Sequence, residues 1–443
     1  MSYKPVCLVT APVGTRSGYG AHSRDICRAL IKLDKYDVKI WPVRWGSTPM
    51  NALHPDDSND KMIIDRLLSE PNLQKQPEVH IHIVIPVEFQ TFGKYNIGIT
   101  AGLETTICKP EWLQGMNRMD LNIVPSTFVH TTLSGIKFDV IDDNTKQKTG
   151  ELANEKPLEV LFEGADSEIY KLTKEFSKSL VDEMDKIDEK FNFLYVGHWL
   201  QGGLGNDRKD TGMLIKVFCE TFKNMKTKPA LIMKTSGAGF SVLDRETMLT
   251  KIKEVKNTIS GDLPNVYLLH GDFMDEEINE LYNHPKVKAH ISLTHGEGFG
   301  RPLLEASLNE KPVIAPNWSG HTDFLKKPNA ILLGGDLSDV PAGSFPDNFH
   351  VDGMQWFTVN YQEASTTLRD VYKNYRKYRL GAKKLTVYNK VKFSLDAMTT
   401  QLGNILDKYV PEFAEEIQLK LPKLNRVDDV EAPKIKLPKL KKV

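Results

Sequence analysis

Two glutamates flank a glycine-rich turn in the second half of the chain. The stretch is Thr294-His295-Gly296-Glu297-Gly298-Phe299-Gly300-Arg301-Pro302-Leu303-Leu304-Glu305, and the apolar run before it, residues 287–293, predicts a buried strand. Pro302 suits a first helical turn, so the sequence predicts exposed backbone N–H groups where a helix begins. Glycines let a diphosphate approach such amides closely, and Glu305, about one helical turn in, can accept hydrogen bonds from ribose hydroxyls. These residues therefore predict a site for a phosphate and a polyol.

Seven residues separate Glu297 from Glu305, and this spacing around Gly-Phe-Gly resembles the E-x7-E motif of retaining GT-B glycosyltransferases of family 4. The segments that follow are similar to the family's continuation, with Lys311 in place of a glycine and Asp323 in place of a glutamate. The resemblance implies an α/β fold of GT-B type, in which two Rossmann-like doubly wound domains face a cleft and a C-terminal helix crosses over. A strand–turn–helix with incidental acids is the alternative.

By this resemblance, the turn and its flanking acids bind a nucleoside-diphosphate sugar. Glu297 would hold sugar hydroxyls and shape the oxocarbenium-like state without forming a covalent bond, and transfer would proceed with retention at the anomeric carbon. The donor-binding residues assigned to this segment are Glu297, Gly298, Phe299, Gly300 and Glu305.

Two adjacent cations, Arg208 and Lys209, follow the first strand expected in the second half of the chain. In the family an arginine and a lysine come after this strand. Lys209 best matches the lysine, and His198 stands where the arginine usually lies. Arg208 is the expected substitute, with a solvated surface residue as the alternative. The pair would neutralise charge on the departing diphosphate, and losing one such group should lower turnover on the order of 10²-fold or more.

Three further residues of the second half are donor candidates. Lys234 follows the apolar run at 230–233 and is expected at the end of a strand that faces the cleft. Gly271 and Phe273 come after a predicted strand that begins at Asn265, and the resemblance places backbone groups of this segment against the base edge. A core aromatic is an equally good interpretation of Phe273.

The first predicted strand, residues 6–10, leads into a glycine-rich turn that includes Gly18 and Gly20. A dinucleotide-binding fingerprint needs a third glycine where Ser23 stands, so NAD binding is disfavoured. The resemblance instead aligns the two glycines with a loop over the donor phosphates or the acceptor; a plain strand-to-helix turn is the alternative. Glu104 lies in a segment that resembles the family's acceptor-facing loop. It is a candidate to orient or deprotonate an acceptor hydroxyl, or else a helix cap or a solvated acid.

Strand-like and helix-like segments alternate through most of the 443 residues, which predicts parallel sheets covered by helices. We expect an N-terminal acceptor domain over residues 1–175 and a C-terminal donor domain over 190–384. A crossover helix region, 385–415, should pack partly on the first domain. In the tail, 416–443, Lys-Leu-Pro-Lys-Leu occurs twice, which predicts a basic arm that packs along the body or binds an anionic surface or a partner chain.

Composition favours a cytoplasmic enzyme, and the absence of one metal-binding motif favours catalysis without a metal. Lysine plus arginine and aspartate plus glutamate each number 58, so the formal net charge of +0 would not draw the whole protein to nucleic acid or membrane. The four cysteines are far apart and indicate reduced thiols, and no apolar run approaches the length of a membrane span. No two aspartates are separated by a single residue, so the D-x-D metal motif of GT-A enzymes is absent. The expected co-substrate is a nucleotide sugar, taken as UDP-linked, with no cofactor.

The identity of the acceptor is open at this point, because fold does not determine substrate. A glycan is the first candidate. Residues 102–106 and 117–120 resemble virus-encoded members whose broader relatives glycosylate modified DNA bases, so a hydroxymethylated DNA base is the second. A catalytically silent sugar-nucleotide sensor or scaffold is the alternative from a different class, although the intact Glu297, Glu305 and Lys209 argue against it. A GT-B phosphorylase lacks an evident pyridoxal-phosphate lysine signature.

Overall fold

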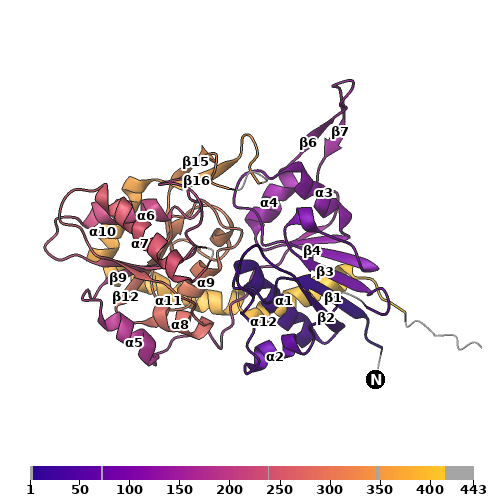
Figure 1. Cartoon of the computed structure of the whole chain (residues 1–443), viewed down its shortest axis with the longest axis horizontal. Coiled ribbons are helices and arrows are strands. Elements are labelled where there is room, and N and C mark those ends of the chain that lie inside the picture. The colour runs from indigo at the N-terminus through magenta and orange to yellow at the C-terminus, as the bar shows by residue number, and fades with distance from the viewer. Residues whose placement is uncertain (1–2, 71–72, 238, 346–348, 415–443) are drawn as a thin grey trace, which may run out of the picture.

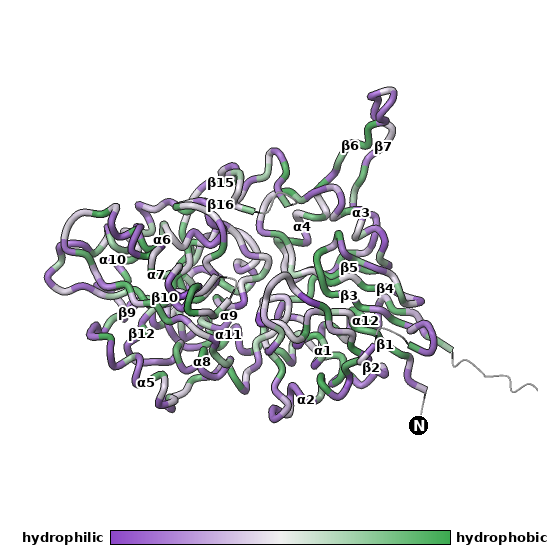
Figure 2. The backbone as a smooth tube through the Cα atoms, in the orientation of Figure 1, coloured by the Kyte–Doolittle hydropathy of each residue, from purple (hydrophilic) through white to green (hydrophobic). Residues whose placement is uncertain are grey.

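The computed structural model describes residues 3–70, 73–237, 239–345 and 349–414. Two domains lie side by side, each built on a parallel sheet with helices packed against it (Figure 1). Hydrophobic residues run along the strands of both sheets, and hydrophilic residues concentrate in the peripheral loops (Figure 2). This is the α/β architecture of two Rossmann-like domains that the alternating segments predict. The basic tail lies outside the described residues, so its partner stays a prediction.

The N-terminal sheet is parallel throughout and has the strand order β2-β1-β3-β4-β5-β8. Side chains alternate between its faces, so Ile81 and Ile83 join a core with helices α1 and α12, while His80 and His82 take the opposite face. The elements of this domain are β1 (Val6–Ala11), α1 (Gly18–Leu33), β2 (Asp37–Pro42), α2 (Ser58–Ile64), β3 (Val79–Ile83), η1 (Pro86–Glu88), β4 (Tyr95–Ile99), α3 (Pro110–Arg118), β5 (Leu121–Val124), α4 (Thr127–Gly135), β6 (Phe138–Ile141), β7 (Lys148–Leu152) and β8 (Leu158–Val160).

The C-terminal sheet has the order β11-β10-β9-β12-β13-β14 and is also parallel. The strand order reverses between β9 and β12, so the loops that follow these two strands leave the sheet side by side. The remaining elements are α5 (Lys178–Asp185), β9 (Asn192–Val196), α6 (Thr211–Phe222), β10 (Ala230–Lys234), α7 (Val242–Asn257), β11 (Val266–Leu269), α8 (Asp275–Asn283), β12 (Val287–Ile291), α9 (Arg301–Ser307), β13 (Val313–Pro316), η2 (Gly320–Asp323), β14 (Ile331–Leu333), β15 (Gly335–Asp339), β16 (Gln355–Val359), α10 (Tyr361–Lys373), α11 (Tyr375–Lys392) and α12 (Leu395–Tyr409).

The last two helices carry the chain back to the first domain (Figure 1). Leu385 of α11 is buried in the core of the C-terminal domain, whereas Leu402 of α12 is buried in the core of the N-terminal domain. Between the helices, the N–H of Ala165 donates to the carbonyl oxygen of Phe393 at 2.9 Å. The predicted crossover helix is therefore present as α12, while the first part of the 385–415 region lies against the C-terminal domain.

Two antiparallel hairpins stand outside the main sheets. β6 pairs with β7 and projects away from the N-terminal domain, and β15 pairs with β16 (Figure 1). All four cysteines are free and buried: Cys7, Cys27, Cys108 and Cys219. Within the described ranges, no helix combines the length and the apolar character needed to cross a bilayer.

Candidate functional site

Four charged side chains meet where the two domains touch. Lys209 forms an ion pair with Glu297, and Arg208 Nη1 lies 3.6 Å from Glu297 Oε2. The same Arg208 nitrogen lies 3.4 Å from Oε1 of Glu104, which belongs to the loop after β4 of the other domain. The fold thus brings all four candidate catalytic residues into one cluster.

The strand order explains how these side chains reach one another. The loop between β9 and α6 carries Arg208 and Lys209, and the turn between β12 and α9 carries Glu297. The N–H of His295 and the hydroxyl of Thr294 donate to the Arg208 carbonyl oxygen, at 2.9 and 3.3 Å. These bonds join the two loops at the point where the strand order reverses, which is where open α/β sheets bind ligands.

The two carboxylates of the cluster differ in proton affinity. Burial alone would raise the pKa of Glu297, but the positive charges of Lys209 and Arg208 outweigh burial and lower this pKa to about 2. Burial raises the pKa of Glu104, and Arg208 opposes this shift only in part. Glu297 is therefore a permanent anion at neutral pH, and Glu104 is the carboxylate better matched to proton transfer.

The glycine-rich turn packs backbone to backbone against the N-terminal domain. A Cβ atom on Gly298 would lie 2.1 Å from the carbonyl oxygen of Ala101, and a Cβ atom on Gly296 would lie 2.2 Å from that of Glu104. Only glycine allows such a close approach of two main chains. These two glycines thus set the contact distance between the domains.

Gly300 and Phe299 have different positions in the same turn. Gly300 has a φ of 96°, in the left-handed region that favours glycine, and it caps α9. The Phe299 side chain is only 2% exposed and packs in the core, with its ring centroid 5.0 Å from that of Phe324. Any donor contact from Phe299 must therefore come from its backbone. Within the described part of the chain, the N–H groups of Phe299 and Gly300 have no protein acceptor, and unpaired N–H groups at a helix start are of the kind that bind anions.

A second cluster in the C-terminal domain joins three more of the donor candidates. Lys234, at the end of β10, donates to the carbonyl oxygen of Gly271 at 2.9 Å, and its Nζ lies 4.6 Å from the centroid of the Phe273 ring. Burial lowers the pKa of Lys234 to about 8, although Asp272 partly opposes the shift. Arg16 of the N-terminal domain reaches across to Asp272, with Nε 3.3 Å from Oδ2. No pattern in the sequence predicts this cross-domain pair.

Gly18 and Gly20 lie at the start of α1 in the N-terminal domain. The N–H of Gly20 donates to the hydroxyl oxygen of Ser17, the N-cap residue, at 3.0 Å. A Cβ atom on Gly20 would lie 2.2 Å from the carbonyl oxygen of Thr15, whereas one on Gly18 would meet nothing within 4 Å. Gly20 is thus required by packing, and Gly18 is not.

Gly20→Ala is therefore expected to lower the free energy of unfolding by about 1–3 kcal/mol, because the new methyl group meets backbone that cannot move aside. Gly18→Ala serves as the matched control and should change this free energy by less than about 0.5 kcal/mol. Urea denaturation followed by circular dichroism measures both values. Equal effects of the two substitutions would contradict the packing argument.

Glu305 belongs to a buried charge cluster that also crosses the domain interface. Arg301 Nε donates to Glu305 Oε1 at 2.9 Å, and the other end of the same guanidinium pairs with Asp25 of α1. Burial raises the pKa of Glu305 to about 7 and that of Glu163, which follows β8, to about 8, and Arg301 opposes both shifts. A ribose at Glu305 would have to share this carboxylate with Arg301.

Three residues of this cluster were not predicted from the sequence: Arg301, Asp25 and Glu163. One signal was available: Arg301 stands directly before the apolar residues of α9, and a charge in a buried segment needs a partner. The identity of that partner was not available, because Asp25 lies 276 positions away.

The raised pKa of Glu163 should make the free energy of unfolding depend on pH. A carboxyl group whose pKa is raised from 4.5 to about 8 by folding stabilises the fold at low pH, and this contribution is lost as the pH rises through 8. Glu163→Gln mimics the protonated form. Between pH 6.5 and 8, its free energy of unfolding should therefore fall less than that of the wild type, by up to about 2 kcal/mol. Urea denaturation at both pH values tests this, and equal changes in the two proteins would contradict it.

Asp323, which stands where the resemblance to family 4 predicts a glutamate, contacts the other domain. Its Oδ2 accepts the N–H of Thr127 at 2.7 Å, at the start of α4. The adjacent Ser126 hydroxyl donates to the carbonyl oxygen of Gly298 at 2.6 Å. The start of α4 thus holds both the glycine-rich turn and the segment that follows it.

Solved structures with the same arrangement identify the fold. The sucrose-phosphate synthase of Thermosynechococcus elongatus matches 92% of this chain and 99% of its own, with a TM-score of 0.61 and 12% sequence identity. HepE of Anabaena, in complex with UDP-glucose, matches 91% of this chain and 100% of its own, with a TM-score of 0.57 and 14% identity. The chain has the GT-B fold. No protein-family model matches the sequence.

Part of the chain also resembles a known glycosyltransferase in sequence. A stretch of 185 residues is 29% identical to the capsular polysaccharide biosynthesis glycosyltransferase CapM of Staphylococcus aureus. The match covers 41% of this chain and 44% of CapM, so it spans less than half of the relative's length. In this GT-B fold, the cluster of Glu297, Lys209, Arg208 and Glu104 lies between the two domains. It sits where the strand order of the second sheet reverses. Among the described residues, no group of three or more His, Cys, Asp or Glu side chains could hold a metal ion.

Proposed function

We propose that the protein is a retaining glycosyltransferase of the family 4 type that moves a sugar from a UDP-linked donor to an acceptor hydroxyl. The observation that carries the proposal is the anionic Glu297, held by Lys209 and Arg208 at the switch point between β9 and β12 and facing Glu104 of the other domain. The partial likeness to CapM and the UDP-glucose bound by HepE support this choice of reaction and donor.

In the proposed reaction, the bond between the anomeric carbon and the β-phosphate oxygen breaks while the acceptor oxygen forms a bond to the same carbon. The acceptor attacks from the face that the phosphate leaves, and its proton passes to the departing phosphate oxygen. No protein nucleophile is required. Because its pKa is about 2, Glu297 stays charged throughout and can hold sugar hydroxyls and stabilise positive charge at the anomeric carbon.

Lys209 and Arg208 take the part that a divalent cation has in other transferases. In the structure Glu297 and Glu104 lie against these two cations and hold them in place before a donor binds. A diphosphate would bring negative charge to cations that are already fixed in position, which removes the need to reorganise them during the reaction. This arrangement supports transfer without a metal.

The acceptor that we propose is a glycan. A hydroxymethylated DNA base is the less favoured acceptor, because the chain has no excess of positive charge to hold a phosphodiester backbone.

The test is incubation with UDP-glucose, UDP-galactose, UDP-N-acetylglucosamine and GDP-mannose in the presence of EDTA. Release of UDP or GDP, with the anomeric configuration of the glycosylated product read by NMR, would establish the donor, the retention and the independence from metal together. Inversion, or turnover only after manganese or magnesium is added, would overturn those parts of the proposal. Tight donor binding by calorimetry without turnover on any acceptor would favour a silent sugar-nucleotide sensor.

A further inference from the structure

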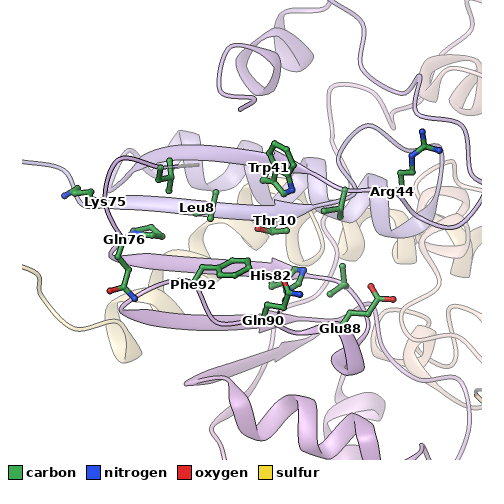
Figure 3. Close-up of a pocket in the computed structure, with 14 residues that line it drawn as sticks. Leu8, Thr10, Trp41, Arg44, Lys75, Gln76, His82, Glu88, Gln90 and Phe92 are labelled. Carbon is green, nitrogen blue, oxygen red and sulfur yellow. Dashed lines mark hydrogen bonds between the residues drawn. The ribbon is translucent and has the colours of Figure 1, made fainter. Parts of the chain in front are cut away.

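A groove lies over strands β1, β2 and β3 of the N-terminal sheet, on the face opposite α1 and α12 (Figure 3). Its volume is about 690 Å³. Parallel sheets normally bury both faces under helices. Here the face that carries Leu8, Thr10 and His82 opens into the groove, whereas α3 and α4 pack near β5. The groove thus marks a stretch of sheet that lacks the usual apolar cover.

The floor of the groove is polar, and His82 presents a hydrogen-bond donor there. His82 is only 5% exposed, and its Nδ1 accepts the N–H of Gln90 at 3.1 Å. Burial lowers the pKa of His82 to about 4, so the ring is neutral and Nε2 carries its hydrogen. That N–H has no acceptor among the described residues. Beside it, the Thr10 hydroxyl lies 3.0 Å from His80 Nε2.

Aromatic and amide side chains form the walls. Trp41 of β2 and Phe92, which follows η1, line opposite sides of the groove, and Phe92 is 46% exposed (Figure 3). The exposed side chains of Gln76 and Gln90 add amide donors and acceptors along the same length. Flat apolar rings combined with neutral donors and acceptors suit a ligand that has both C–H faces and hydroxyl groups.

We propose that this groove binds a carbohydrate chain and anchors the acceptor at a distance from the reacting hydroxyl. The proposal rests on the proposed function, because it names the acceptor as an oligosaccharide or longer glycan. A nucleic acid fits less well, since Arg44, Lys75 and Glu88 leave only one net positive charge among the lining residues. A peptide strand fits less well, since the groove lies on the face of the sheet and offers no edge for backbone pairing.

The groove leads toward the candidate site. Arg44 and Glu88 lie where β2 and β3 end, and the residue after Arg44, Trp45, stacks on Tyr19 at a centroid distance of 4.0 Å. The Tyr19 hydroxyl lies 2.8 Å from that of Thr100, at the start of the loop that carries Glu104. A chain that leaves the groove at this end would therefore meet the wall that presents Glu104.

Binding of fluorescently labelled hexasaccharides of glucose, mannose, N-acetylglucosamine and xylose, measured by fluorescence polarisation without donor, tests the inference. At least one should bind, and Phe92→Ala should weaken its affinity about tenfold. Tyr388→Ala is the matched control, because Tyr388 is a similarly exposed aromatic residue, 42% exposed, on α11 of the other domain. Gln76→Ala provides a second probe at an exposed residue in case Phe92→Ala perturbs folding, and it should weaken affinity about threefold.

Two results would overturn the inference: binding of none of the hexasaccharides, or binding that neither groove substitution weakens. The release of UDP from the donor is measured on the same variants. It shows whether the protein uses a donor, and so tests the proposed function independently of saccharide binding in the groove. Phe92→Ala should leave the slow hydrolysis of donor in water unchanged. Saccharide binding by a protein that uses no donor would uphold the groove and reject the transferase.

Discussion

Lys209→Met is expected to lower the turnover number by about 10²–10³-fold. Methionine keeps the apolar stem of the side chain and removes the charge that is paired with Glu297. The Lys209 side chain is only 17% exposed, so in the proposed reaction its charge would act across a medium of low polarity and would stabilise a departing diphosphate more than it would in water. The measurement is UDP release at saturating donor and acceptor.

Folding and catalysis must be separated in this experiment. Without Lys209, Glu297 keeps only Arg208, and breaking a buried ion pair can destabilise a protein by about 3–5 kcal/mol. The double variant Lys209→Met, Glu297→Gln removes both charges and should recover unfolding free energy while remaining inactive. Lys234→Met removes the charge of the buried lysine in the second cluster and should raise KM for the donor more than it lowers kcat. Turnover of Lys209→Met within about threefold of the wild type would contradict the role of the cation.

The fold could be predicted from the sequence wherever apolar runs are long and regular. The runs at 6–10 and 287–293 form β1 and β12, and the glycine-punctuated turn after the second run does lead into a helix. The hairpin β6–β7 could not be predicted in this way, because its strands are mostly exposed and lack an apolar period. The order of the strands in each sheet could not be predicted from local sequence patterns either, because it depends on contacts between distant segments.

Some features of the site could likewise be predicted from the sequence, and others could not. The family resemblance placed Arg208, Lys209 and Glu297 around one diphosphate, and in the structure the loops that carry them meet where the strand order reverses between β9 and β12. The burial of the Phe299 ring could not be foreseen, since a glycine on each side leaves the direction of the side chain open. Charge pairs across the domain interface depend on how the domains dock, and no spacing in the sequence records that.

Gly298→Ala is expected to lower kcat/KM by about 10²-fold while each domain stays folded. The added Cβ atom would lie 2.1 Å from the carbonyl oxygen of Ala101, and both partners are main chain, so no side-chain rotation can relieve the clash. The domains must then move apart, which carries Glu104 away from Arg208 and admits water to the site. A misplacement of about 1 Å is enough for a loss of this size.

Gly203→Ala is the matched control for this prediction, because a Cβ atom on Gly203, in the loop after β9, would meet nothing within 4 Å. Circular dichroism should show unchanged secondary structure in both variants. Small-angle X-ray scattering should show a larger radius of gyration only for Gly298→Ala, since the clash acts between domains and not within one. Wild-type kcat/KM in Gly298→Ala would mean that the turn and the Ala101 loop need not touch during catalysis, and that closure at this point is not part of the working state.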